Sequence, residues 1–324
     1  MPPRAGVWDD AEMAASGHER SSMHIATLAS GMDLTLPVLT IHGTRRGPVV
    51  GISATIHGEE VVGVQVIRDL WQSLIAAEIA GTLVMMPLCN PLSFEALSRN
   101  TPLDMLDLNR TFPGSDEGWL TDRISHAVTT KFLSQIDYYI DIHAGGTFPV
   151  VDYCYLVNDE HFARAFLAQL LYRPKQMYPG VSASVTRDRG IPTVVIELGG
   201  GYIGQSEYIA RGVRSIRNML RAAGMLEGDV ETRPGQIALH ELKVIRPKNG
   251  GLCYPAGDHR PGTEWPGGTK LAEIVSMRTF EPIEIMETPF ERNIMVLHRN
   301  CVTRVNPGDY AFMAGNLATA ERLE

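Results

Sequence analysis

Apolar, strand-like runs alternate with amphipathic helical stretches between residues 48 and 224, and this alternation constrains the fold more than any other feature of the sequence. The stretches between the runs carry apolar residues at helical spacing. Because a strand–helix–strand repeat places helices on both faces of a mostly parallel sheet, we expect an α/β domain with a parallel or mixed sheet. The strand-like runs are 48–58, 81–91, 138–146 and 191–201, and the helical stretches are 59–79, 122–136, 162–172 and 206–224.

Both ends of the chain differ from this middle part. The first residues, 1–20, are polar, which predicts a loosely held N-terminal arm. Two alternating runs, 21–28 and 34–43, then predict a pair of strands. After about residue 229 we find no helical period, and short β-rich runs separated by Pro and Gly turns predict a small all-β module of barrel or sandwich type. The predicted units are an arm over 1–20, an α/β domain over 21–229 and a β-rich domain over 230–324.

Composition excludes several classes of protein. The net charge of −8 argues against a nucleic-acid binder, whose phosphate contacts need a basic face. The longest stretch without a charged residue, 79–94, contains two prolines and is too short to cross a bilayer. Four cysteines without a C-x-x-C pair predict reduced thiols, and the N-terminus lacks the apolar core of an export signal. We expect a cytoplasmic protein with no nucleic-acid or membrane partner; a homo-oligomer stays open.

Two strand-end histidines are the first candidates for chemistry. His57 and Glu60 form an H-x-x-E pair where a predicted strand turns into a helix, and His143 ends an apolar strand. A surface loop with glutamates at a helix N-terminus would also show an isolated H-x-x-E pair. Two such histidines with a glutamate, however, form the His₂Glu set that binds zinc and leaves a position open for water. Asp141 lies on the same side of its strand as His143, and is either the partner of a ligand imidazole or a buried carboxylate satisfied by backbone donors.

Two further regions place polar side chains in unusual settings. Glu197 closes an apolar strand before three glycines. It is either a general base whose pKa is raised by burial or a capped or ion-paired strand end. The segment 90–114 is long, polar and rich in turns, and it holds Arg99, Asn109 and Arg110. Arginine suits the recognition of a carboxylate and the stabilisation of an oxyanion, although for any single arginine a surface ion pair is the commoner role.

Five separated motifs follow one another along the chain: HGEE, NP, DLNRTFPG, IDIHAGG and VVIELGGG. In this order they resemble the succinylglutamate desuccinylase/aspartoacylase family, which belongs to the zinc carboxypeptidase clan, over about residues 35–225. The resemblance implies a zinc-dependent catalytic domain with a carboxypeptidase-like fold over 21–229, followed by the family's smaller β-rich domain. It also implies one zinc ion per chain, held by His57, Glu60 and His143.

The same resemblance implies roles for the other candidates. Glu197 corresponds to the general base of the family, and Asn109 and Arg110 correspond to the pair that binds the substrate carboxylate. An arginine upstream of that pair polarises the scissile carbonyl, and Arg99 is the candidate for it. The variants of the motifs fit bacterial branches that deacylate N-acyl amino acids, among them deacetylases of acetylated diamino acids.

Three hypotheses for the function follow from these residues. The first is a zinc amidohydrolase that removes an acyl group from a small N-acyl amino acid by promoted-water attack. An acetyl group is favoured over a succinyl group, which would need a further cation such as Arg187 or Arg189. The alternatives are a zinc carboxypeptidase acting on short peptides and a non-catalytic binding protein that keeps the fold. The presence of all three ligands and of Glu197 argues against the binding protein.

Overall fold

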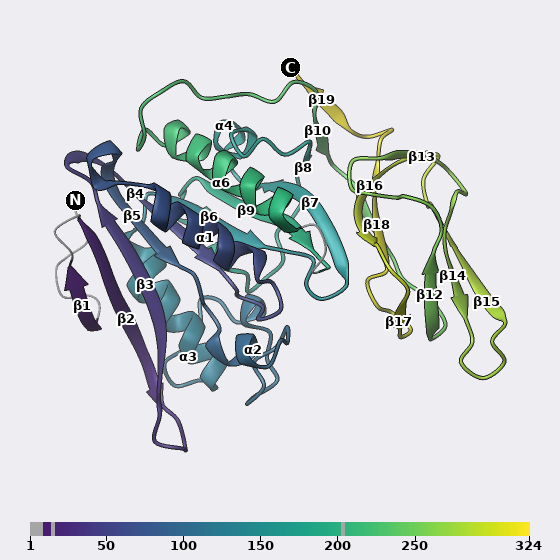
Figure 1. Cartoon of the computed structure of the whole chain (residues 1–324), viewed down its shortest axis with the longest axis horizontal. Coiled ribbons are helices and arrows are strands. Elements are labelled where there is room, and N and C mark those ends of the chain that lie inside the picture. Colours follow the sequence, from purple (N-terminus) through teal and green to yellow (C-terminus); the bar gives the residue numbers. More distant parts are fainter. Residues whose placement is uncertain (1–8, 14–16, 202–204) are drawn as a thin grey trace.

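A computed structural model of the chain describes residues 9–13, 17–201 and 205–324, and its centre is one long mixed sheet (Figure 1). From one edge to the other the sheet contains β1 (Asp9–Met13), β2 (His18–Thr27), β3 (Asp33–His42), β5 (Ala80–Met86), β4 (Arg45–Ala54), β6 (Tyr138–His143), β9 (Thr193–Gly200), β7 (Pro149–Leu156), β16 (Arg292–Arg299), β18 (Phe312–Asn316) and β11 (Leu242–Ile245). The four central strands β5, β4, β6 and β9 are parallel, and the strands on either side of them pair antiparallel. The predicted parallel or mixed sheet is therefore confirmed.

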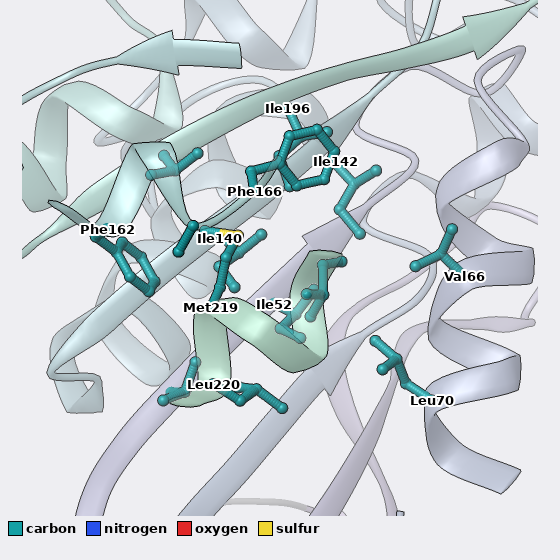
Figure 2. Packing of buried hydrophobic residues seen from close by; sticks show 14 of the residues in the cluster. Ile52, Val66, Leu70, Ile140, Ile142, Phe162, Phe166, Ile196, Met219 and Leu220 are labelled. Carbon is teal, nitrogen blue, oxygen red and sulfur yellow. The ribbon is translucent and has the colours of Figure 1, made fainter. Parts of the chain in front are cut away.

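Helices cover both faces of the central strands, as predicted. On one face lie α1 (Val62–Ser73), α4 (Glu160–Arg164) and α6 (Gln205–Ala222), and on the other α2 (Pro91–Glu95), α3 (Leu120–Ala127) and α5 (Ser182–Asp188). Short turns of 3-10 or π helix cover Ala76–Glu78, Leu108–Arg110, Val128–Phe132 and Leu133–Gln135. Figure 2 shows the first face, where strand residues such as Ile52 and Ile140 pack against Leu70 of α1 and Met219 of α6. No helix in the described part of the chain is both long and apolar enough to cross a membrane.

The C-terminal part is all β, as predicted, but it is not separate from the central sheet. A second sheet contains β15 (Pro282–Glu287), β14 (Lys270–Val275), β12 (Gly251–Pro255) and β17 (Thr303–Val305). Its apolar face packs on β18 and β16, which makes a sandwich with residues such as Leu271, Ile274 and Phe312 in the middle. Because β16 pairs with β7, the sandwich continues the central sheet beyond β7, which separates it from β9. Four short strands complete the pairing: β8 (Leu170–Tyr172), β10 (Gln236–Leu239), β13 (Glu264–Pro266) and β19 (Glu321–Leu323).

Three local expectations differ from the structure. Within the predicted arm 1–20, β1 and the first residues of β2 pair antiparallel at the sheet edge, while residues 1–8 and 14–16 lie outside the described residues. An edge strand needs only one apolar face, so its polar sequence resembles a loop. The helix expected over 162–172 ends at Arg164, because Leu170–Tyr172 pairs with β7 and β10 as β8. The strand β7 was not predicted.

Candidate active site and metal centre

The carboxyl ends of three adjacent parallel strands carry the central residues of the site. In open α/β sheets this edge is where functional groups collect. His57 follows β4, His143 is the last residue of β6, and Glu197 lies on β9 directly in register with His143. Because β4, β6 and β9 are neighbours in the sheet, residues from three distant parts of the chain meet at one edge.

The turn that carries His57 is fixed against the loop that follows β5. The backbone N–H of Gly58 donates to the carbonyl of Ser98 at 2.9 Å. Gly58 also lies so close to the backbone of Ser93 that an added Cβ would clash with it. That loop is itself ordered by Asn90, whose side chain caps α2 by accepting from the N–H of Ser93 at 3.2 Å. A glycine is therefore required beside the first histidine of the site.

His57, Glu60 and His143 form a compact group of potential metal ligands. The Nδ1 atom of His57 lies 2.7 Å from Oε1 of Glu60, and the Nδ1 atom of His143 lies 2.8 Å from Oε2 of the same carboxylate. One ligand atom from each of the three residues lies within 4.8 Å of the other two, and all three residues are buried. Two imidazole nitrogens and one carboxylate are the donor set of a zinc ion with an open coordination position. The residues present therefore fit one zinc ion.

The outer nitrogen of each histidine has a carboxylate partner. Nε2 of His57 lies 3.1 Å from Oδ1 of Asp107, and Nε2 of His143 lies 3.2 Å from Oδ2 of Asp141. A carboxylate on the second ring nitrogen fixes the tautomer of an imidazole, so that Nδ1 is left free to bind a metal. Both imidazoles thus present Nδ1 toward Glu60.

Asp141 is held by hydroxyl groups rather than by backbone donors. Ser53 donates to its Oδ1 at 2.7 Å, and Ser182 donates to its Oδ2 at 2.5 Å. Burial would raise the pKa of Asp141, but His143 and the two hydroxyl groups hold it below its usual value. Of the two roles expected for Asp141, the geometry favours that of a partner for the imidazole of His143.

Glu197 faces the same group from β9. Burial raises the pKa of its carboxyl group to about 7, and the carboxylate of Glu60 adds to this increase while His143 opposes it. A carboxyl group with this pKa can accept a proton and donate it again at neutral pH. The setting of Glu197 suits a general base and acid.

Asn109 and Arg110 lie together on the 3-10 turn Leu108–Arg110. The side-chain Oδ1 of Asn109 accepts from the backbone N–H of Ser182 at 3.0 Å, and its Nδ2 lies 3.4 Å from Nε2 of His143. Arg110 is exposed, donates to the carbonyl of Asn109 at 2.6 Å, and lies over the ring of Tyr178 at 5.2 Å. Its guanidinium group has further N–H donors available for an anion.

Arg99 lies close to the potential metal ligands and is bound to Asp107. Its Nε donates to Oδ2 of Asp107 at 3.0 Å, and its Nη1 lies 3.5 Å from Nδ1 of His57. Burial lowers the pKa of the guanidinium group, but Asp107 outweighs this effect and raises it. The arginine therefore stays charged beside the ligand group.

A cavity of about 910 Å³ is lined by all the site residues that the sequence predicted: His57, Glu60, Arg99, Asn109, Arg110, Asp141, His143 and Glu197. The β-rich module also contributes to this wall, through residues such as Leu297, Arg299 and Tyr310. Arg187 and Arg189, the expected source of a further cation, are not on it. Arg187 pairs with Asp188, and Arg189 donates to backbone carbonyls that include that of Ser134.

The sequence analysis did not predict two residues of the site, Asp107 and Ser182. Asp107 begins the DLNR motif, in which only the Asn and the Arg were assigned. Since a ligand histidine usually has a carboxylate or carbonyl on its outer nitrogen, an Asp next to the Asn-Arg pair could have been recognised as that partner of His57. Ser182 gave no such signal, because only the packing of α5 against β6 brings it to Asp141.

The chain is similar to known proteins in sequence and in fold. The model of the succinylglutamate desuccinylase/aspartoacylase catalytic domain matches residues 46–223. The N-alpha-acetyl-L-2,4-diaminobutyric acid deacetylase of Halomonas elongata is 26% identical over 293 residues, which cover 85% of this chain and 83% of that protein.

Two solved structures have the same fold. A succinylglutamate desuccinylase/aspartoacylase from Rhodobacter sphaeroides superimposes with a TM-score of 0.81 at 22% identity, over 95% of this chain and 98% of that one. The product-bound ectoine utilization protein EutE (DoeB) from Ruegeria pomeroyi has a TM-score of 0.83 at 22% identity, over 94% and 97% of the two chains. The likeness extends over both the α/β domain and the β-rich module.

Proposed function

This chain belongs to the succinylglutamate desuccinylase/aspartoacylase family, and from that premise we propose that it is a zinc-dependent deacylase of a small N-acyl amino acid. The observation that carries the proposal is the buried group of His57, Glu60 and His143 beside Glu197, at the wall of one cavity. Such a site can hold one zinc ion per chain and a water next to a carboxyl group that exchanges protons at neutral pH.

In this proposal the reaction is the hydrolysis of an amide bond. Zinc held by the three ligands supplies Lewis-acid chemistry, which polarises a carbonyl group and makes a water more acidic. Glu197 accepts a proton from the attacking water and then donates it to the nitrogen of the leaving amine. Asp107 and Asp141 keep the two imidazoles in place throughout.

Three residues at the rim would bind and orient the substrate. Asn109 and Arg110 are placed to hold the carboxylate of the amino acid, because Asn109 lies next to His143 and the exposed guanidinium group of Arg110 lines the same cavity. Arg99 is placed nearer to the ligands and would stabilise negative charge that develops on the carbonyl oxygen.

An acetyl group is favoured over a succinyl group. A succinyl carboxylate would need a further cation, and the two arginines expected to supply it, Arg187 and Arg189, do not line the cavity. The other arginines on its wall beyond Arg99 and Arg110 are Arg299 and Arg304, from the β-rich module, and Arg299 donates to the carbonyl of Tyr310. The relative from Halomonas elongata, which bears the name of a deacetylase, supports the same choice. The β-rich module forms part of the cavity wall, which favours a small substrate over a peptide and counts against the carboxypeptidase alternative. The buried, unpaired cysteines Cys89, Cys154 and Cys253 agree with a reducing, cytoplasmic location.

A substrate screen tests this proposal. Release of free amine is measured from N-acetyl, N-succinyl and N-formyl amino acids and from tripeptides, with the purified enzyme and equimolar zinc. We expect N-acetyl amino acids to be hydrolysed fastest. Faster hydrolysis of tripeptides than of every N-acyl amino acid would support the carboxypeptidase instead, and no hydrolysis of any substrate would support the binding protein.

A further inference from the structure

A short segment, residues 144–147, joins the group of potential metal ligands to the end of β9. We call residues 144–147 the bridge segment. It follows His143 directly and contains two of the glycines that mark this part of the sequence. At its first residue, the backbone N–H of Ala144 donates to Oε2 of Glu60 at 3.2 Å. The bridge segment therefore begins on the carboxylate that both candidate ligand histidines contact.

The middle of the bridge segment is bonded to the end of β9. The backbone N–H of Gly145 donates to the carbonyl of Gly199 at 3.0 Å, and the backbone N–H of Gly201 donates to the carbonyl of Gly146 at 2.9 Å. Glu197 lies on the same strand, two residues before Gly199. A shift of the bridge segment would therefore move the end of the strand that carries the proposed general base.

Glu59 holds the last residue of the bridge segment. Its Oε2 accepts from the hydroxyl of Thr147 at 2.8 Å and from the backbone N–H of the same residue at 3.3 Å. Gly146, just before it, has a φ of 74°, and an added Cβ would lie 2.9 Å from Cδ of Glu59. Only glycine fits there without strain, since the chain is left-handed at that residue and passes directly over the carboxylate.

The two glutamates of the HGEE motif thus contact opposite ends of the bridge segment. Glu60 faces the ligand group and accepts from the first residue, whereas Glu59 is half-buried on the cavity wall and accepts from the last. Hydrogen bonds to a carboxylate are stronger than those between neutral groups. The contact of Glu59 with Thr147 is therefore suited to fix the segment against the turn after β4.

We propose that Glu59 is a positioning residue, which through Thr147 and the bridge segment holds the end of β9 at the distance from the ligand group that proton transfer by Glu197 requires. This inference rests on the proposed deacylase function. Glu59 itself transfers no proton and binds no substrate. A general base must lie within hydrogen-bond reach of the proton it accepts, and a misplacement of about 1 Å costs on the order of 10²-fold in rate.

Removal of the contact from either side tests the inference. Glu59→Ala and Thr147→Val should each lower kcat about tenfold, with KM and zinc content nearly unchanged, because other residues hold the metal and the substrate carboxylate. Since both changes break one contact, the double variant should also lose about tenfold rather than about a hundredfold. Losses that multiply, or a rise in KM without a fall in kcat, would overturn the inference.

Conservative variants separate the contact from the charge. Glu59→Gln keeps an oxygen that accepts from Thr147, and Thr147→Ser keeps the hydroxyl, so kcat should stay close to that of the wild type. A loss in Glu59→Gln as large as in Glu59→Ala would contradict a positioning role. Glu284→Ala is the matched control: Glu284 accepts from the backbone N–H groups of Lys248 and Asn249 in the β-rich module, away from the cavity wall, and kcat should not change.

Hydrogen–deuterium exchange measured by NMR tests the positioning without any hydrolysis. In Glu59→Ala the backbone N–H groups of Gly145 and Gly201, which join the bridge segment to β9, should exchange about tenfold faster than in the wild type. Glu284→Ala should leave both rates unchanged. Faster exchange would support the hold of Glu59 on β9 even if no amide were hydrolysed. Unchanged exchange of both groups in Glu59→Ala would overturn the inference and leave the deacylase function standing.

Discussion

At the scale of single residues, each histidine of the site contacts two carboxylates, one on each ring nitrogen. In both candidate ligand histidines, Nδ1 faces Glu60 and Nε2 contacts a carboxylate, that of Asp107 for His57 and that of Asp141 for His143. The motifs predicted these histidines as metal ligands, because a histidine at the end of a buried strand stands out in the sequence. The serines that hold Asp141 could not be predicted, since their contacts depend on how distant elements pack.

Replacement of Glu197 by Gln keeps the shape of the side chain and removes its ability to carry a proton. We expect kcat to fall by roughly 10²–10⁴-fold, the range of general acid–base catalysis. Glu197 is the residue of β9 that lies in register with His143, and its amide replacement cannot accept the proton of the attacking water. Metal content should be unchanged, because Glu197 is not in the ligand group. Steady-state kinetics with elemental analysis measures both, and near-normal turnover would assign the proton transfer to another residue.

The two arginines at the rim are expected to differ in their kinetic effects. Arg110→Ala should mainly raise KM, since its exposed guanidinium group binds a carboxylate that is present before and during the reaction. Arg99→Ala should mainly lower kcat, since its group lies beside the ligands, where negative charge develops. Saturation kinetics on one N-acetyl amino acid separates the two effects. Small and equal changes in both variants would identify the arginines as surface ion pairs.

At the level of elements, the site residues meet because β4, β6 and β9 are adjacent parallel strands whose carboxyl ends lie at one edge of the sheet. β4, β6 and β9 could be predicted from their apolar sequences and from the residues at their ends. β7 was missed because it pairs antiparallel with β9 across a long separation. Its tyrosines, Tyr153 and Tyr155, face the cavity, while Asp152 pairs with Arg211 of α6. The helix expected over 162–172 has a helical pattern, but tertiary pairing makes its last residues a strand.

Gly58 tests the close contact between the turn after β4 and the loop after β5. In Gly58→Ala the added Cβ would clash with the backbone of Ser93, so the turn must move. We expect a loss of at least about 2 kcal/mol in the free energy of unfolding, together with weaker zinc binding, because His57 moves with the turn. Gly250→Ala is the control, since its Cβ would meet nothing closer than 3.4 Å. Denaturant unfolding measures both variants; equal, small effects would mean that the turn adapts without cost.

At the level of the whole molecule, the β-rich module is joined to the catalytic domain by strand pairing as well as by packing. Pairing of β16 with β7 places the module beside the strand that carries Tyr153, one strand away from β9. The sequence predicted that alternating strands and helices give way to strands alone near residue 229. It did not predict the shared sheet, because edge-to-edge pairing between units leaves no local pattern.

His298 lies on β16 at this junction, and its burial predicts how stability depends on pH. Burial lowers its pKa to about 4 from an ordinary value of 6.5, so the folded chain disfavours the charged imidazole. Between these values the unfolded chain holds a proton that the folded chain lacks, so stability is lost as the pH falls from 6.5 toward 4. The loss should be on the order of 2 kcal/mol and absent in His298→Asn. Unfolding free energies of both proteins across this range measure it; parallel curves would contradict the prediction.

The most direct test of the central claim is the metal content of the purified protein together with its turnover of an N-acetyl amino acid. We predict one zinc ion per chain by elemental analysis, loss of turnover when a chelator removes it, and recovery when zinc is restored. His57→Ala should show neither stable zinc nor turnover, because it removes one ligand of the group at β4 and β6. Full turnover by metal-free protein, or by His57→Ala with normal zinc content, would contradict the account.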